Sequence, residues 1–346
     1  MSKAKQEGLL GCPPNPFRVG CKDKWPSITK SGLSFRFLFF LEENVKGSVS
    51  KWIAWIFLWS TAFFWGASFV ATKLVVGVVP PFFAATVRFF LAWVALRLFS
   101  RGRPYGKPLD LVFAGFWGIT MYFVFENSAL LFTTPTNAVL IISTIPLMNL
   151  FYLRLVHRSP VLSQQLWGGL LAFCGVALVV LSGHFVLALN PLGDLLILGA
   201  AFSWVFYTHY MMRIEKEGEK QGRRNPLGVT RVMTFWGFLF FLPFAGWEIA
   251  NGQVHGEVFV HSPLLWVGLL YLGLFCSALG YFFWNRAIQE LGPRTTTNAI
   301  YAMPVVTALV EGLLLHRFPH VLTLSGGVLI LSGLFLSEKK AKRIRS

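Results

Sequence analysis

Ten apolar runs, each close to the length that crosses a lipid bilayer, dominate the sequence. A membrane-spanning helix needs about 20 mostly apolar residues. Lipid offers no hydrogen bonds to the backbone, so each run must satisfy its own backbone groups as a helix. We therefore expect an all-α integral membrane protein with ten transmembrane helices. These cover approximately residues 52–78, 82–99, 110–132, 138–156, 165–183, 193–214, 231–250, 264–288, 296–315 and 321–337.

The composition fits a membrane protein better than a soluble one. Of the 346 residues, 55% are hydrophobic and 13% are charged, whereas a soluble domain carries roughly 25% charged residues. This hydrophobicity argues against a soluble globular enzyme and against a disordered chain. The four cysteines form no CxxC pair, so neither a disulfide framework nor a zinc site is predicted.

The net charge of +16 lies almost entirely outside the apolar runs. Four segments, residues 1–51, 101–110, 213–231 and 337–346, together carry +14 of it. If the N-terminus is cytoplasmic, nearly all basic connections face the cytoplasm, and the positive-inside rule then places both termini there. The basic residues therefore predict contact with anionic membrane lipids rather than with nucleic acid.

The two ends of the chain are predicted to be basic cytoplasmic tails, residues 1–51 and 338–346. The apolar run at residues 35–41 is too short for a span and lacks a signal-peptide layout, so we expect the first tail to be disordered. An organelle transit peptide is the alternative, against which its acidic residues argue. These are Asp23, Glu42 and Glu43.

The chain contains an internal repeat. Residues 125–146 read FENSALLFTTPTNAVLIISTIP and residues 283–304 read FWNRAIQELGPRTTTNAIYAMP, an ungapped offset of 158. We therefore expect two five-helix halves, residues 52–184 and 193–337. Because five is odd, the second half enters the membrane from the opposite side, which gives the inverted repeat that many secondary transporters use. Helix packing alone would not explain the ungapped register.

The segment WGASFVATKLVVGVVPPFFAATVRF (Trp65–Phe89) and the turns that end in Pro146 and Pro304 resemble the drug/metabolite transporter superfamily, in particular its ten-helix EamA branch. The resemblance covers about residues 52–337. It implies an exporter or permease of amino acids or other small metabolites, typically in the bacterial cytoplasmic membrane. The family's Gly-Glu pairs after the fourth and ninth helices are replaced by His157-Arg158 and His316-Arg317, so no role of those carboxylates is carried over.

Ionisable side chains inside the apolar runs are costly, which makes each one a candidate functional residue. Lys73 and Arg88 lie near the first outer turn. They either snorkel towards headgroups or face a cavity and attract an anionic group such as a carboxylate. Glu126 and Glu311 are candidates for proton coupling, with helix-to-helix hydrogen bonding as the alternative for both.

Aromatic and polar side chains inside the runs predict a small-molecule site. Asn127 and Asn285 are equivalent in the repeat and suit either substrate binding or helix-to-helix bonding. Aromatic walls with a few hydroxyl groups are the usual make-up of such a site, although plain packing is the alternative. The further residues expected to form the pocket are Trp65, Ser68, Trp204, Tyr207 and Tyr301.

No catalytic or ATP-binding motif is present: the sequence lacks HExxH, GxSxG and GxxxxGK[ST]. We therefore predict a secondary transporter that moves a small-molecule substrate by alternating access, without catalytic residues, metal or cofactor. Gly-rich helices would allow the halves to slide in close contact. The alternatives are an intramembrane enzyme acting on lipid and a non-transporting membrane scaffold or sensor. Assembly into a homo-oligomer is compatible with the sequence.

Overall fold

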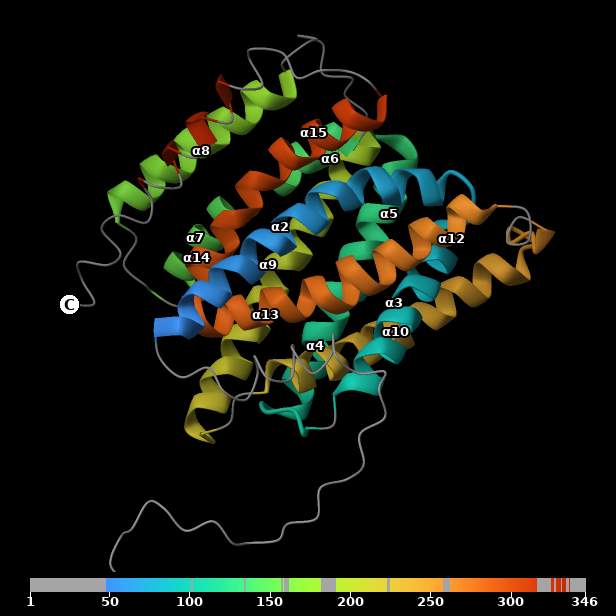
Figure 1. Cartoon of the computed structure of the whole chain (residues 1–346), viewed down its shortest axis with the longest axis horizontal. Helices are drawn as coiled ribbons and strands as arrows, with labels where there is room; N and C mark the ends of the chain where they lie inside the picture. Colours follow the sequence, from blue (N-terminus) through green and yellow to red (C-terminus); the bar gives the residue numbers. More distant parts are fainter. Residues whose placement is uncertain are drawn as a thin grey trace, which may run out of the picture. The chain divides into compact units, whose positions relative to one another are not determined.

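The computed structural model describes residues 48–100, 102–133, 135–156, 158, 162–181, 191–222, 225–257 and 262–315, together with eight residues between 325 and 336. The predicted tails lie outside these ranges apart from residues 48–51, as do His157, His316 and Arg317. Within the described part, every regular element is a helix (Figure 1).

The first half of the described chain contains five helical regions, of which two are interrupted. The third region contains a π-helix, η1, and the fourth breaks at Ser143 and Thr144, whose hydroxyls bond back to Val139 O and Ile141 O. In order, the elements are α2 (Ser48–Val76), α3 (Pro81–Phe99), α4 (Pro108–Gly115), η1 (Phe116–Met121), α5 (Tyr122–Phe132), α6 (Pro135–Ile142), α7 (Ile145–Leu155) and α8 (Ser163–Leu181).

The second half repeats this order. Its third region again contains a π-helix, η2, and its fourth is again divided. The elements are α9 (Pro191–Lys220), α10 (Pro226–Ala250), α12 (Pro263–Leu270), η2 (Tyr271–Leu279), α13 (Gly280–Leu291), α14 (Pro293–Asn298), the 3₁₀-helix η3 (Ala299–Ala302) and α15 (Met303–Leu315). The matching interruptions are what a duplicated sequence predicts.

Six of the described helical regions are long and apolar enough to cross a membrane. The expected fourth and ninth spans are present as broken helices, and the expected tenth, residues 321–337, lies largely outside the described residues. Prolines in the first turn start several of these helices, where the missing N–H would be unpaired anyway. The six regions are Lys51–Val76, Pro81–Phe99, Pro108–Phe132, Pro191–Lys220, Pro226–Ala250 and Pro263–Leu291.

Helices α3 and α10, the second helices of the two halves, lie side by side and antiparallel (Figure 1). At the start of α3, the Glu248 carboxylate accepts hydrogen bonds from Phe82 N at 3.0 Å and Phe83 N at 2.6 Å. At its other end, Arg231 donates to Ser100 O at 2.5 Å. An anion at the helix N-terminus and a cation at its C-terminus both complement the helix dipole, so α10 stabilises both ends of its partner.

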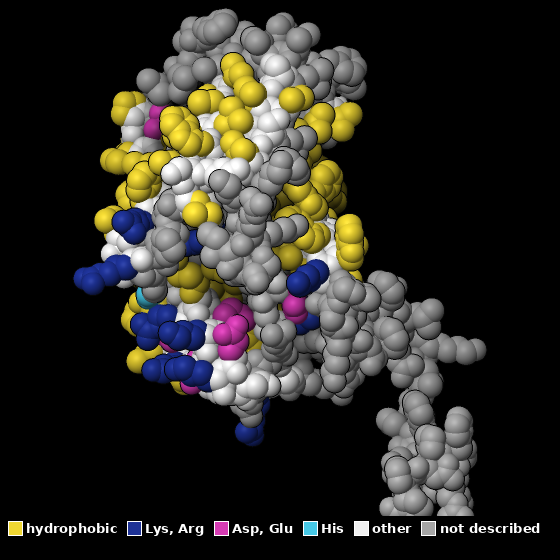
Figure 2. All heavy atoms as spheres, turned by 90° about the vertical axis from the view of Figure 1, so that its left-hand side faces the viewer, with side chains coloured by type: hydrophobic (Ala, Val, Ile, Leu, Met, Phe, Trp, Pro, Cys, Tyr) yellow, Lys and Arg dark blue, Asp and Glu magenta, His cyan; other side chains and the backbone are white. Residues whose placement is uncertain are grey.

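The end of the bundle where α3 and α9 finish is the basic end. Arg103, Lys107, Arg213, Lys216 and Lys220 are exposed there. Figure 2 shows Lys and Arg gathered in the lower part of the view, below a largely hydrophobic surface. This is the end that the positive-inside rule predicts to be cytoplasmic. We name the other end, where α3 starts and α10 finishes, the opposite end.

Candidate functional site

A buried cavity lies at the interface of the two halves, with a volume of about 30 Å³. This volume holds about two water molecules. Its lining comes from α2, α3, α5, α6 and α7 of the first half and from α9, α13, η3 and α15 of the second. The lining residues are Trp65, Ser68, Phe69, Arg88, Tyr122, Phe123, Glu126, Ile142, Ile145, Trp204, Tyr281, Ile300 and Met303.

Aromatic rings form much of the cavity wall, and Trp65 lies at their centre. Its ring centroid is 5.2 Å from that of Trp204 and 5.3 Å from that of Tyr281, both edge to face, which is a favourable geometry for aromatic pairs. Its Nε1 donates a 2.8 Å hydrogen bond to Cys276 O. Trp65, Ser68 and Trp204, three of the residues expected from the sequence to form a pocket, therefore line the same cavity.

Arg88 is buried in the cavity wall, with 2% of its surface exposed. Its Nε donates a 2.6 Å hydrogen bond to Ser277 Oγ, and its guanidinium carbon lies 4.3 Å from the ring centroid of Phe123. Its Nη1 is buried without a hydrogen-bond partner. Of the two readings of Arg88 from the sequence, the structure places this side chain in the cavity and not at a headgroup.

Glu126 lies one helical turn after Tyr122 on α5, and both side chains line the cavity. Glu126 as a whole residue is 2% exposed. Arg88 and Glu126 carry the two formal charges among the described lining residues. Within the part of the chain that the structure describes, no N···O distance of 4.0 Å or less joins them. The cavity thus holds a cation and an anion that are not paired with each other.

The two π-helices flank this site. Ser277, which holds Arg88, belongs to η2, and Tyr281 immediately beyond it donates a 2.5 Å hydrogen bond to Gly118 O in η1. Single π-turns inside α-helices recur at functional sites because the extra residue re-aims the side chains that follow. No pattern in the sequence indicated η1 or η2.

Sequence reasoning missed Tyr122, Phe123, Ser277 and Tyr281 as parts of this site. The repeat contained a signal for two of them. Phe123 and Tyr281 are equivalent at the offset of 158 residues, and each lies one turn before the candidate pair that the alignment had singled out. The structure places both against the cavity.

Lys73 is not among the cavity-lining residues, and its ammonium group binds backbone carbonyls at the end of α5. Its Nζ donates to Leu130 O and, at 3.3 Å, to Thr133 O, where α5 ends. A cation there satisfies carbonyls that have no partner within the helix. Thr133 Oγ1 in turn donates to Asp194 Oδ1 at 3.1 Å, which joins the two halves at the opposite end.

The two equivalent asparagines both connect helices within their own half. Asn127 Nδ2 donates to Pro81 O at 3.0 Å, between α5 and α3. Asn285 Nδ2 donates to Thr230 Oγ1 at 2.8 Å, between α13 and α10, and its Oδ1 accepts from Tyr207 Oη at 2.5 Å. The structure therefore shows the helix-to-helix arrangement for both.

Two further candidates lie elsewhere. Tyr301 is buried beside Gly169, where a Cβ on the glycine would meet its hydroxyl at 3.4 Å, and it is not among the cavity-lining residues. Glu311 belongs to α15, but its side chain lies outside the described part of the chain.

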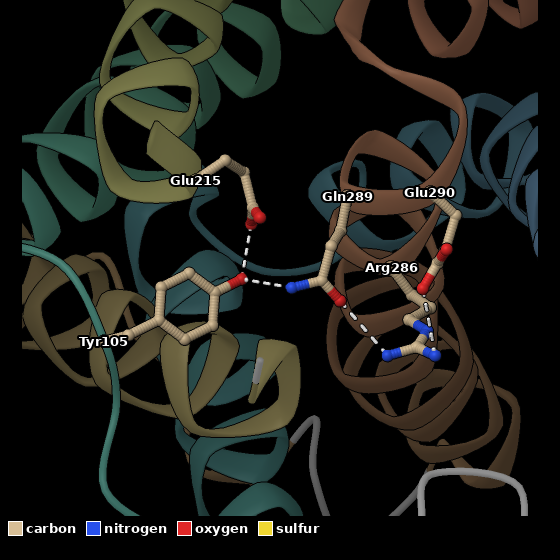
Figure 3. A network of polar contacts seen from close by, with 5 residues as sticks. All are labelled: Tyr105, Glu215, Arg286, Gln289 and Glu290. Carbon is tan, nitrogen blue, oxygen red and sulfur yellow. Dashed lines mark hydrogen bonds and ion pairs between the residues drawn. The ribbon is translucent and has the colours of Figure 1, made fainter. Parts of the chain in front are cut away.

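A network of five polar side chains joins the two halves near the basic end of the bundle (Figure 3). Tyr105, in the connection before α4, donates from Oη to Glu215 Oε1 at 2.5 Å and accepts from Gln289 Nε2 at 3.0 Å. Arg286 binds Gln289 Oε1 at 3.1 Å and Glu290 Oε1 at 3.1 Å. Tyr105 belongs to the first half and the other four to the second. We name these five residues the latch.

No cluster of three or more His, Cys, Asp or Glu side chains suited to a metal occurs among the residues that were placed. The polar groups around the cavity are instead one guanidinium, indole N–H groups and hydroxyls, together with one carboxylate as an acceptor. Such a set can bind a small polar molecule by hydrogen bonds and charge.

Comparisons with known proteins agree with this architecture. The EamA-like transporter family matches residues 50–181 and 191–338. An "Uncharacterized transporter" of Archaeoglobus fulgidus is 28% identical over 292 residues, covering 81% of this chain and 95% of that protein. The "Probable amino-acid metabolite efflux pump" of Escherichia coli strain K12 is 25% identical, covering 79% and 90%. A crystal structure with 19% identity covers 87% of this chain and 100% of that one at a TM-score of 0.66, which indicates a shared fold.

Proposed function

The chain belongs to the EamA-like transporter family and is a multi-pass membrane transporter rather than an enzyme, and we propose that it exports a small metabolite such as an amino acid by alternating access. The observation that carries this proposal is the cavity between the two halves. Behind its aromatic walls it contains a guanidinium with one nitrogen that has no hydrogen-bond partner, and a carboxylate that forms no ion pair with it. The relatives named as amino-acid metabolite efflux pumps support the substrate class and the direction.

Many secondary transporters carry out alternating access with two halves that run in opposite directions through the membrane. The antiparallel pairing of the equivalent helices α3 and α10 supports this inversion. Together with the charge on the basic end, it supports ten spans with both termini in the cytoplasm of a bacterial or archaeal cell.

Contacts between the two halves lie on either side of the cavity of about 30 Å³. The latch ties the halves at the basic end, and Thr133 with Asp194 ties them at the opposite end. A metabolite larger than about two waters enters only when one set of contacts opens. Opening the two ends in turn is the transport cycle that we propose.

Close backbone approaches would let helices slide during that cycle. A Cβ at Gly175 of α8 would lie 2.7 Å from Gly326 O, and one at Gly333 would lie 2.5 Å from Gly168 O. Both distances are too short for a side chain, so glycine is required for this contact. Small residues at such crossings are typical of closely packed membrane helices.

The test is counterflow in liposomes that contain the purified full-length protein. Liposomes loaded with an unlabelled amino acid should take up the labelled form saturably, and protein-free liposomes should not. Glu126→Gln and Arg88→Gln should reduce the flux at unchanged protein content, because each removes one charge from the cavity. An absence of saturable flux across a panel of amino acids and related metabolites would falsify the proposal.

A further inference from the structure

We infer that Arg88 and Glu126 together select a substrate that carries both a carboxylate and an ammonium group, with Arg88 binding the carboxylate and Glu126 the ammonium. This inference rests on the proposed function, since it concerns what the transport cavity accepts. It goes further because it assigns a role to each charged residue, and to Ser277 as the residue that positions Arg88.

The first step is the fixed orientation of Arg88. Its Nε is held by Ser277 Oγ at 2.6 Å, and its guanidinium lies over Phe123 at 4.3 Å and over Phe89 at 5.3 Å. These contacts occupy Nε and place two aromatic rings near the guanidinium group. The Nη1 remains buried and without an acceptor. A buried charged donor without a partner is costly, and a carboxylate is the acceptor that fits a guanidinium best.

The second step is that Glu126 does not supply this acceptor. Both residues line one buried cavity, yet the described residues show no ion pair between them within 4.0 Å. Opposite charges that are buried together normally pair, because each one pays a large desolvation cost alone. Here Arg88 is tethered to Ser277 and the Glu126 carboxylate is hydrogen-bonded to Tyr122, so neither charge is neutralised by the other and both can attract a charged ligand.

The third step is the charge balance of the cavity. The described lining carries one positive and one negative formal charge, from Arg88 and Glu126. A ligand with a carboxylate alone would leave the negative charge of the glutamate uncompensated, and one with an ammonium alone would leave the positive charge of the arginine uncompensated. A zwitterion satisfies both. The indole rings of Trp65 and Trp204, which line the cavity, add a favourable environment for an ammonium or an apolar side chain.

The fourth step is that the repeat does not duplicate these charges. At the offset of 158 residues, Glu126 corresponds to Trp284, and aligning the first residues of α3 and α10 matches Arg88 with Met233. Both charges thus come from the first half, whereas Ser277 comes from the second. A symmetric scaffold carries an asymmetric site, as binding of one oriented zwitterion requires.

The experiment uses sets of three ligands with the same side chain: the zwitterion, the amine that lacks the carboxylate and the acid that lacks the ammonium group. The phenylalanine set is L-phenylalanine, phenethylamine and 3-phenylpropionate. The corresponding leucine set is L-leucine, isopentylamine and 4-methylpentanoate. Binding to the purified full-length protein is measured by thermal shift and by tryptophan fluorescence, and counterflow is measured in liposomes. We expect the wild-type protein to prefer one zwitterion over both of its single-charge analogues by about tenfold or more.

Two variants separate the two charges. Arg88→Gln should remove the preference for the zwitterion over the amine, and Glu126→Gln should remove its preference over the acid. Arg88→Lys keeps the positive charge but loses the planar guanidinium, whose two parallel N–H groups match a carboxylate, so it should retain part of the preference. Lys216→Gln and Glu219→Gln, which change exposed charges at the basic end, are matched controls and should leave the ligand ranking unchanged.

The outcomes distinguish this inference from the proposed function. Saturable counterflow of other metabolites without preferential zwitterion binding would overturn the inference and leave the transporter proposal standing. Zwitterion binding without any flux would support the inference and overturn the transporter proposal. An unchanged ligand ranking in both Arg88→Gln and Glu126→Gln, with normal melting temperature and elution profile, would also overturn the inference.

Discussion

The Nε of Arg88 and the hydroxyl of Ser277 are joined by a 2.6 Å hydrogen bond that crosses from one half of the protein to the other. The arginine belongs to α3 and the serine to the π-helix η2. A buried hydrogen bond to a charged group is among the stronger polar contacts in proteins. This bond therefore orients the guanidinium of Arg88 in the cavity, and it can form only while the two halves keep this relative position.

Ser277→Ala should weaken substrate binding. Without the hydroxyl, the guanidinium loses its tether and is free to turn towards Glu126. A hydrogen bond to a charged group contributes about 1.5–3 kcal/mol, so we expect the affinity for a transported zwitterion to fall about tenfold or more. Fluorescence titration measures this. Ser277→Thr retains the hydroxyl and should remain close to wild type. Equal affinities for Ser277→Ala and wild type would show that the tether does not matter for binding.

Tyr105→Phe should open the basic end. Its hydroxyl is the shared partner of Glu215 and Gln289, so its removal breaks the connection between the halves within the latch. With Ser68→Cys as a reporter in the cavity wall, in a background without other cysteines, labelling by a membrane-impermeant maleimide from the basic side should accelerate about tenfold. Tyr210→Phe, a neighbouring change on α9 that leaves the latch intact, is the control. A labelling rate equal to the control would contradict the role of the latch.

Glu248→Gln should lower stability without changing substrate preference. The carboxylate accepts from Phe82 N and Phe83 N at the start of α3, where a negative charge and a cap each contribute about 0.5–2 kcal/mol. We expect a lower apparent melting temperature in detergent. Glu257→Gln, at an exposed site in the following connection, should have no such effect. A large change in ligand ranking for Glu248→Gln would mean that this residue does more than cap the helix.

Asn285→Ala tests whether the helix-to-helix hydrogen bonds of this asparagine serve stability rather than substrate binding. Asn285 bonds to Thr230 and Tyr207, and its removal leaves these buried partners unsatisfied at a cost of about 1–3 kcal/mol. Thermal stability should fall while the zwitterion retains its advantage over its amine and acid analogues. Asn127→Ala, at the equivalent position, should behave in the same way. Loss of ligand discrimination at normal stability would instead place the amide in contact with substrate.

Much of the architecture follows from local properties of the chain. The length and polarity of the apolar runs require membrane helices because lipid cannot satisfy backbone groups. The ungapped repeat implies two equivalent halves, and α3 with α10 and η1 with η2 bear this out in the described residues. Counting polar residues at bilayer depth also singled out Arg88 and Glu126 as candidates, and the structure places both in the wall of one cavity.

Which polar side chains face that cavity is a matter of packing. Polar residues in an apolar run are unusual, and the structure gives three of them different partners. Lys73 binds carbonyls at the end of α5, and Asn285 joins α13 to α10. Arg88 lies in the cavity wall, where its Nη1 has no hydrogen-bond partner. Hydropathy defines the depth of a residue but not the rotation of its helix. That rotation depends on neighbouring helices and on the extra residue of each π-turn. The tether from Ser277 to Arg88, between residues far apart in sequence, therefore emerges only when the two halves are packed together.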